Sequence, residues 1–251
     1  MKLSFKDHFS EASEDYRQYR PDYPSALYDY LATVAPSRRH AWDCATGTGQ
    51  AAAMLGQHFA QVIASDASAS QIQQARPAHN VTYRVMPAEH TDLPAASIDL
   101  ICVAQALHWF KLDSFFEEAQ RVLRPGGILA VWCYQLLNIN VEIDNIINHL
   151  YGDTLDAFWP AERRMIENGY RHIHFPFKRE TSPAFSMQAS WNLHQLLGYL
   201  STWSASRACI RAGHEDPVAA IAEQLQQYWG DAHQCRPVKW PLTLIICRKN
   251  N

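Results

Sequence analysis

The fold of this chain can be read from the segment Trp42-Asp43-Cys44-Ala45-Thr46-Gly47-Thr48-Gly49-Gln50, which leads into Ala51-Ala52-Ala53-Met54-Leu55. An apolar run ends there in a carboxylate, passes through a turn with two glycines and opens onto an alanine-rich run. We therefore predict a strand, a tight loop and the start of a helix. Gly47 and Gly49 allow backbone conformations and close approaches that a Cβ atom would block. The unpaired N–H groups at the helix start then attract an anionic ligand.

A second anchor is Asp66, which ends the apolar run Val62-Ile63-Ala64-Ser65. It lies 19 residues beyond Gly47, close to the ~20 expected for an acid that binds ribose hydroxyls at the next strand end. The pattern Gly47-x-Gly49-x-x-Ala52 fits the dinucleotide fingerprint with alanine at its third place, although such a loop alone is a weak signal. Together these features predict a nucleoside cofactor that spans both loops.

Asp43 indicates which cofactor is bound. In nicotinamide enzymes the first strand usually runs apolar into the glycines, whereas a carboxylate closes it here. A carboxylate at this point suits a ligand that carries cationic groups. S-adenosylmethionine carries an ammonium and a sulfonium, and it has an adenosine whose ribose Asp66 could hold.

The motifs resemble, in their order, those of the class I S-adenosylmethionine-dependent methyltransferases. The resemblance covers about residues 38–134 and rests on Asp43-x-Ala45-x-Gly47-x-Gly49, Asp66, Ala88-Glu89 and Arg124-Pro125-Gly126-Gly127. Ala45 departs from it, because it occupies a place that is commonly glycine. Since alanine is the smallest replacement, we expect a slightly tighter loop and no loss of function.

Three further segments are similar to the small-molecule branch of that family, which includes the trans-aconitate methyltransferases of fungi. They are Tyr19-Arg20-Pro21-x-Tyr23-Pro24, Ala104-Gln105-Ala106-Leu107-His108-Trp109-Phe110 and Gly198-Tyr199-Leu200-Ser201-Thr202-Trp203-Ser204-Ala205. The resemblance implies a small-molecule acceptor, with S-adenosylmethionine as cofactor and S-adenosylhomocysteine as its product.

The expected fold is one α/β domain over residues 1–251, with a Rossmann-like, seven-stranded, mostly parallel sheet that has helices on both faces and an antiparallel C-terminal hairpin. Residues 1–36 would form an N-terminal helical lid with two helices, or a packed strap. Residues 37–134 would form the cofactor-binding core, and residues 135–251 the substrate-side helices and the last strands. Alternating periodicity predicts strands at 40–44, 61–65, 81–85, 98–104 and 127–134, and helices near 50–58, 68–75, 88–92 and 112–123.

The pattern beyond residue 134 is less regular. We expect helices at 141–151 and 153–168, a strand near 172–178, and a long helix at 189–212. Asp216 and Pro217 have the residue types that begin a helix, and 238–247 reads as a strong strand. The strands near 172–178 and 238–247 would form the hairpin, and the helices between them would be an insertion over the substrate.

The resemblance also implies which residues bind the ligands. Those expected to bind the cofactor are Tyr19, Arg20, Asp43, Ala45, Thr46, Gly47, Gly49, Gln50, Asp66, Ala67, Gln71, Ala88, Glu89 and Gln105. Those expected to face the substrate are Tyr23, Trp132, Tyr134, Tyr199 and Trp203. Glu89 would face the adenine edge, or is a glutamate favoured at a helix start. Arg20 suits a carboxylate, either that of the cofactor's methionine or that of an acidic substrate.

His108 is the titratable group with a pKa near neutral in the loop 105–110, which makes it a candidate base. Alternatively it orients the cofactor or the substrate. The expected reaction is an in-line displacement at the methyl group. A carboxylate acceptor would need no base, since it is ionised at neutral pH, whereas a hydroxyl, phenol or amine would need one.

Composition narrows the class of acceptor. The net charge is −3, and no basic cluster exceeds the pair Arg38-Arg39, which disfavours a nucleic-acid partner. No Pro-Pro or Pro-Cys pair occurs, although base-modifying methyltransferases usually carry one. The six cysteines are scattered, and no apolar run of about 18 residues or signal core is present. We therefore expect a reduced, cytoplasmic protein without a membrane partner, either a monomer or a homodimer.

Three alternatives remain open from the sequence. An NAD(P)-dependent oxidoreductase shares the glycine loop and the ribose acid, and a protein could bind S-adenosylmethionine without catalysis. A methyltransferase acting on a macromolecule would need an extended basic surface.

His172-x-His174 could contact a metal, but no carboxylate or cysteine lies nearby at ligand spacing, so no metal site is expected.

Overall fold

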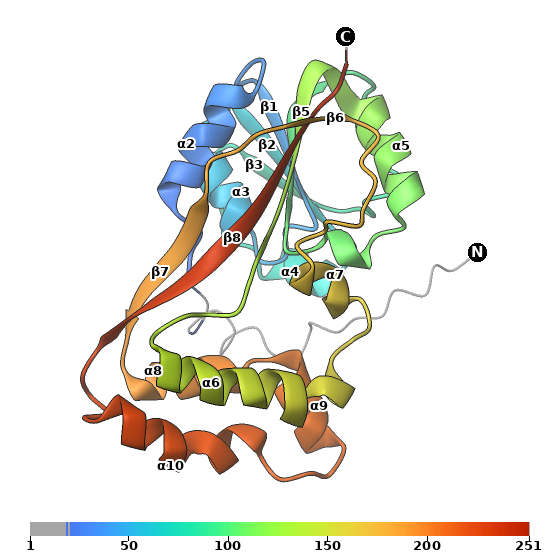
Figure 1. Cartoon of the computed structure of the whole chain (residues 1–251). Helices are drawn as coiled ribbons and strands as arrows, with labels where there is room; N and C mark the ends of the chain where they lie inside the picture. The colour runs from blue at the N-terminus through green and yellow to red at the C-terminus, as the bar shows by residue number, and fades with distance from the viewer. Residues whose placement is uncertain (1–18, 20, 251) are drawn as a thin grey trace.

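The computed structural model describes Tyr19 and residues 21–250, in which eight strands form one sheet. The strand order is β3-β2-β1-β4-β5-β8-β6, and β7 also pairs with β8. The first five strands are parallel, whereas β8 runs antiparallel to its three partners. This confirms a Rossmann-like sheet with an antiparallel C-terminal end (Figure 1).

The parallel strands lie close to where the sequence predicts them. They are β1 (His40–Cys44), β2 (Gln61–Asp66), β3 (Val81–Val85), β4 (Ile98–Ala104) and β5 (Leu123–Tyr134). Central strands read as continuous apolar runs because helices cover both faces of a parallel sheet. All but the last residue of β4 is buried, which fits this explanation.

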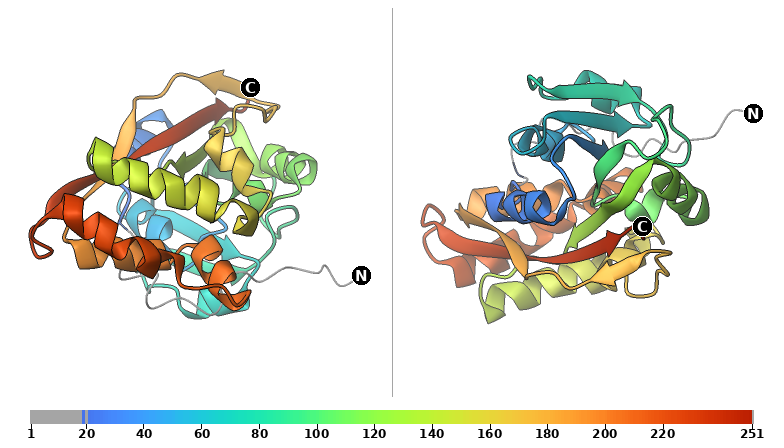
Figure 2. Two further views of the ribbon diagram at one scale, coloured as in Figure 1. Left: turned by 60° about the horizontal axis from the view of Figure 1, so that its bottom comes forward. Right: turned by 90° about the horizontal axis from the view of Figure 1, so that it is seen from above.

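Two hydrophobic clusters occupy the two faces of the sheet. On one face, α2 (Ser25–Val34) and α3 (Gln50–Leu55) contribute to the cluster that contains Leu100 and Ile128. On the other, α5 (Leu112–Val122) contributes to the cluster that contains Ile101 and Leu129. Figure 2 shows α2 and α5 on opposite sides of the sheet. The predicted helix near 68–75 is the shorter α4 (Ala69–Gln73), capped by Ser68.

The helix predicted near 88–92 is wrong, because these residues form bends between β3 and β4. Glu118 of α5 holds this segment: its Oε1 atom accepts hydrogen bonds from the backbone N–H and the hydroxyl of Thr91. Arg121 donates to the same carboxylate from the next turn of α5. A buried carboxylate of α5 thus replaces the hydrogen bonds that a helix would have made.

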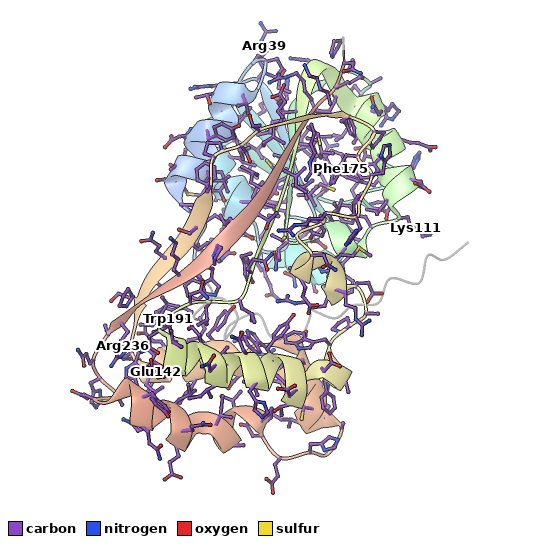
Figure 3. The ribbon with its side chains drawn as sticks, viewed as in Figure 1. Arg39, Lys111, Glu142, Phe175, Trp191 and Arg236 are labelled. Atoms are coloured by element: carbon purple, nitrogen blue, oxygen red, sulfur yellow. The ribbon has the colours of Figure 1, made fainter. Side chains whose placement is uncertain are left out.

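The hairpin also differs from its prediction. Residues 172–177 form turns and a loop, and Phe175 packs on Phe116 of α5 with ring centroids 5.3 Å apart (Figure 3). Two separate strands, β6 (Lys178–Glu180) and β7 (Phe185–Trp191), pair with opposite halves of the long β8 (Arg236–Arg248). This sharing of β8 explains why the described residues contain eight strands instead of seven.

The helix predicted at 189–212 is two helices that follow β7. Asn192 and Gln195 form a capping box that begins α8 (Leu193–Ser201). The chain then breaks at Trp203, whose backbone is extended, before α9 (Ser204–Arg211). The Ser206 hydroxyl donates to the carbonyl of Leu200 across this break. Trp191 marks the join between β7 and α8 in Figure 3.

The expected helix at 153–168 is interrupted as well. The helix α6 (Val141–His149) continues into a π-helical turn, η2 (Leu150–Thr154), and a 3₁₀ turn, η3 (Asp156–Phe158), before the short α7 (Arg163–Glu167). Pro160 follows η3 and cannot donate a helical hydrogen bond. By contrast, α10 (Pro217–Trp229) begins as expected, because the Asp216 side chain accepts from the N–H groups of Val218 and Ala219.

A layer of helices lies beyond the carboxyl ends of the parallel strands. Figures 1 and 2 show α6, α8, α9 and α10 gathered at that end of the molecule, where the chain leaves β5 toward α6. Aromatic side chains connect this layer to the sheet: Tyr199 of α8 accepts a hydrogen bond from Nε1 of Trp240 on β8 at 3.2 Å. Ligands of such sheets bind at this edge. The expected first helix of the lid and Arg20 lie outside the described residues.

Candidate active site

Asp43 is the penultimate residue of β1, and its carboxylate is fully buried. Its Oδ2 atom accepts from the Thr46 hydroxyl at 2.5 Å, and within the described part of the chain Oδ1 has no partner at hydrogen-bond distance. Burial raises the pKa of Asp43 to about 7, and the Asp66 carboxylate adds to this, while the Thr46 hydroxyl and the nearby backbone N–H of Ala52 oppose it. Such a group is stabilised by a cation placed against its unpaired oxygen. The ammonium and sulfonium of S-adenosylmethionine fit this requirement.

The loop after Asp43 turns through three residues with positive φ. These are Ala45 at 58°, Gly47 at 56° and Gly49 at 83°. The helix α3 begins at Gln50 directly afterwards. A Cβ atom on Gly49 would lie 2.9 Å from Cε1 of Tyr83, so glycine is needed there for space as well as conformation. Ala45 adopts the left-handed conformation that a glycine would adopt more easily.

Asp66 connects the two loops that the sequence assigns to the cofactor. Its Oδ2 atom accepts from the backbone N–H of Gly47 and its Oδ1 atom from that of Ser68, both at 2.9 Å. Each carboxylate oxygen has a second lone pair, so these bonds are compatible with ribose hydroxyls. Gln71 reaches the same loop, and Ala67 lies exposed beside it. Asp66 therefore holds the loops together, a role that the sequence did not indicate.

Glu89 fastens a third loop to this edge. Its Oε1 atom accepts from the backbone N–H of Lys111, the residue that precedes α5, at 2.9 Å. Figure 3 shows Lys111 at this end of α5. Ala88 beside it is buried. Glu89 therefore does not begin a helix of its own, and its contact with adenine stays a prediction.

Gln105 holds the strand ends of β4 and β5 together. Its backbone has a φ of 56°, its N–H donates to the carbonyl of Trp132, and its Oε1 accepts from the N–H of Tyr134. The Nε2 atom of Gln105 and the indole Nε1 of Trp132 are buried donors with no partner among the described residues. Buried donors are normally satisfied, so both indicate a ligand with acceptor atoms.

The residues predicted to face the substrate belong to one aromatic cluster: Tyr23, Trp132, Tyr134, Tyr199 and Trp203. Tyr23 meets Trp132 edge to face with ring centroids 5.5 Å apart. Tyr199 and Trp203 approach to 6.0 Å. The structure thus places in one hydrophobic cluster side chains from the segment before α2, from β5, from α8 and from the break before α9, which are distant in sequence.

His108 lies in the turn after β4, and it is 6% exposed. Its Nδ1 atom is 3.1 Å from the hydroxyl of Tyr170, and its ring lies against Trp109. Burial lowers the pKa of His108 to about 3, and the positive charge of Arg163 contributes to the shift. The imidazole is therefore neutral and a weak base at neutral pH. The structure favours an orienting role for it.

Arg163, the first residue of α7, was not a candidate in the sequence analysis. Its Nε–H donates to the hydroxyl of Tyr151 at 3.1 Å, and its guanidinium carbon lies 5.0 Å from the ring centroid of Trp159. Its positive charge adds to the burial that lowers the pKa of His108, and it opposes the burial that raises the pKa of Tyr170. No sequence signal could have found it, because these neighbours come from separate elements.

Metal and membrane features are absent from the described residues. No group of three or more His, Cys, Asp or Glu side chains among them is placed to hold a metal ion. His172 and His174 lie exposed in a loop instead of on a strand. No helix in the described residues is long and apolar enough to cross a membrane.

Comparisons with known proteins find methyltransferases among the similar sequences and structures. A family model described as a methyltransferase domain matches residues 42–131. A Dictyostelium discoideum protein named "putative methyltransferase" is 36% identical over 253 residues, covering 98% of this chain and 96% of that protein. A structure from Anaeromyxobacter dehalogenans, titled a "putative type II methyltransferase", has a TM-score of 0.87 and 42% identity, and the match covers 93% of this chain and 100% of that one.

A third relative matches about half of this chain. It is a malonyl-acyl-carrier-protein O-methyltransferase of Dechloromonas aromatica, 36% identical over 133 residues. The match covers 52% of this chain and 47% of that protein.

Proposed function

Because this chain belongs to the methyltransferase domain family and is an S-adenosylmethionine-dependent methyltransferase, we propose that it methylates a carboxylate oxygen of a small molecule. The bound cofactor would supply a methyl group whose carbon–sulfur bond breaks, with its electron pair left on sulfur, as the bond to the acceptor oxygen forms. Family membership favours this cofactor over the nicotinamide alternative.

The residues at the ends of β1 and β2 would hold the cofactor. Asp43 would place its unpaired oxygen against a cationic group of the cofactor, and the carboxylate of Asp66 would accept from the ribose hydroxyls. Glycine at positions 47 and 49 lets the backbone approach the ligand closely. Orientation of two reactants in this way can be worth ~7–11 kcal/mol of the barrier.

The observation that carries the carboxylate proposal is that four titratable groups near the ends of β4 and β5, among the described residues, are poor bases at neutral pH. Burial sets the pKa of His108 to about 3, and those of Cys133 and Tyr151 to about 12. Burial also raises the pKa of Tyr170 well above its usual value. None of these four groups accepts a proton readily at neutral pH. A carboxylate acceptor is already ionised there and needs no base.

The charges of the proposed reaction balance without a proton transfer. The acceptor loses its negative charge as the ester forms, and the sulfonium loses its positive charge. The protein therefore has to align the two groups and exclude water. The O-methyltransferase from Dechloromonas aromatica, a relative over about half of this chain, supports oxygen as the methylated atom.

The charge of the chain supports a small acceptor. The formal net charge is −3, and no run of basic residues offers a surface for a nucleic-acid backbone. We expect the protein to act in the cytoplasm as one domain, as a monomer or a homodimer.

The pH dependence of the rate tests the proposal. Saturating S-adenosylmethionine removes the effect of Asp43 titration on cofactor binding. Under that condition kcat/KM for a carboxylic acid acceptor should change by less than about threefold between pH 6 and 9, because no base titrates. A tenfold rise per pH unit at the acid end of this range would instead show an essential base and refute the base-free mechanism.

A further inference from the structure

Arg163 is a cation that lacks an anion among the residues described. Among the described residues, the side chain of Arg163 makes one hydrogen bond, which its Nε–H donates to the Tyr151 hydroxyl. No described ion pair includes its guanidinium. Its side chain is only partly exposed. The planar guanidinium has two further nitrogens whose N–H groups point outward from the fork. Within the described residues these groups have no acceptor.

Among the described residues, hydrogen bonds connect Arg163 to a negative charge only through the Tyr151 hydroxyl. The Tyr151 hydroxyl donates to Oε1 of Glu167 at 2.5 Å, and it accepts from Arg163 on its other side. Glu167 itself is exposed to solvent. The contact with the face of Trp159 at 5.0 Å is favourable for a cation, although it does not supply a hydrogen-bond acceptor. The terminal nitrogens of Arg163 thus remain available to a ligand.

The groups around Arg163 are neutral donors rather than acids. They come from four different elements, which are the turn after β4, the end of β5, the η2 turn and the turn after α7. The groups whose pKa values are affected by the charge of the guanidinium are His108, Cys133, Tyr151 and Tyr170. Their pKa values leave these four groups uncharged at neutral pH, so one positive charge stands among neutral side chains.

The position of Arg163 is on the acceptor side of the site. Asp43 lies level with Cys102 on β4, whereas Trp132 pairs with Ala104 nearer the carboxyl edge. Tyr134 is two residues further along β5. Gln135, which directly follows β5, donates from its Nε2 atom to the carbonyl of Ile166 on α7 at 3.3 Å, so the helix that carries Arg163 lies against that end of β5. The cofactor loops of β1 and β2 lie on the other side of β4 in the sheet.

We propose that Arg163 binds the acidic group of the acceptor, a carboxylate, through the terminal nitrogens of its guanidinium, with the Tyr151 hydroxyl holding the guanidinium in place. The site thereby selects acceptors with a negative charge over their neutral analogues. This inference rests on the proposed function, because it assigns the acceptor side of the same reaction.

The site can be tested without catalysis, in the protein saturated with S-adenosylhomocysteine. Succinate, citrate, benzoate and phenylacetate serve as probes, each beside its neutral amide. The acids should raise the melting temperature and the amides should not. Calorimetry then measures the affinity of the acid with the largest effect for the wild type, Arg163→Met, Arg163→Lys and the control Arg164→Met. Arg164 is the exposed neighbour on the same helix, and its described hydrogen bonds all come from its backbone.

Arg163→Met should lower the affinity for the acid by about tenfold or more, and Arg163→Lys by severalfold, because lysine lacks the planar fork. Arg164→Met should stay within about twofold of the wild type. Affinity for S-adenosylhomocysteine should be unchanged in all three variants. Unchanged binding of the acid by Arg163→Met, or no stabilisation by any of the acids, overturns the proposal. If Arg163→Met does not fold, the ratio of acid to amide affinity in Arg163→Lys decides in its place.

Adding S-adenosylmethionine to the bound acid separates this inference from the proposed function. Binding through Arg163 without formation of a methyl ester would leave the anion site intact and reject carboxylate methylation. Ester formation at an equal rate and equal KM in Arg163→Met would support the methylation and reject the site.

Discussion

Replacing Asp43 by asparagine should stabilise the protein without ligand and weaken its binding of S-adenosylmethionine. The carboxylate is fully buried, and its Oδ1 atom has no partner within the described residues. Its charge is therefore costly until a cation is bound. Asparagine keeps the shape of the side chain and removes the charge, so folding and binding should change in opposite directions.

The magnitude follows from the pKa of Asp43, which burial raises from 3.8 to about 7. A shift of about three units corresponds to at most about 4 kcal/mol. The folded pKa lies above the unfolded one, so stability falls as pH rises from about 4 to about 7. The full cost is present above pH 7. The pKa of about 7 already includes the opposing hydrogen bond from Thr46, so the gain for Asp43→Asn above pH 7 should be clearly positive and at most about 4 kcal/mol.

Urea unfolding of the ligand-free protein at pH 8.5 and pH 5.0 measures this effect. The gain in free energy of unfolding should be clearly larger at pH 8.5, because the cost of the charge at pH 5 is only about 2 kcal/mol. At pH 8.5 the calorimetric Kd for S-adenosylmethionine should rise at least about tenfold. A gain in free energy of unfolding at pH 8.5 that does not exceed the gain at pH 5.0 would refute the reasoning. An unchanged Kd for S-adenosylmethionine would refute it as well.

Asp99 provides a matched control for this experiment. It is 1% exposed, but its carboxylate pairs with Arg124 at 2.9 Å and accepts from the backbone N–H of His40. Asp99→Asn should therefore destabilise the protein, since it breaks a paired buried charge. It should leave the affinity for S-adenosylmethionine unchanged, because the residue lies near the amino end of β4.

Three further variants test individual contacts. Ala45→Gly should change the free energy of unfolding by no more than about 1 kcal/mol in either direction. Glycine relieves the strain of a φ of 58° but increases the conformational entropy of the unfolded chain. The cofactor affinity measured by calorimetry should stay within about twofold. Gly198→Ala should destabilise by about 1–3 kcal/mol in urea unfolding, because its Cβ would lie 2.6 Å from the ring of Tyr19. His108→Asn should lower kcat/KM by less than about tenfold without altering the pH profile, whereas loss of a true base would cost about 10²–10⁴.

The cofactor-binding half was predictable because its signals are local. Buried parallel strands read as apolar runs, and Asp43 and Asp66 each directly end such a run. The helix expected near 88–92 failed because the hydrogen bonds of Thr91 go to Glu118, which is distant in sequence. A local pattern does not record such a partner.

The acceptor side was harder to read for the same physical reason. The alternation of Ser186, Gln188 and Ser190 places polar residues on one face of β7. This strand leads directly into the apolar stripe of α8, and the helix predicted at 189–212 therefore includes the last residues of β7. The side chains that contact Arg163 come from other elements, so its own segment of sequence does not indicate a role for it. The proposed role of Arg163 follows only from the fold, which places those elements together.

Transfer of an isotope-labelled methyl group from S-adenosylmethionine to a carboxylic acid tests the central claim most directly. Mass spectrometry of the purified protein's reaction with the four acids should detect the label in a methyl ester that alkali cleaves, together with S-adenosylhomocysteine. A label that stays on nitrogen or carbon after alkali treatment, or no transfer to any of the acids, would contradict carboxylate methylation.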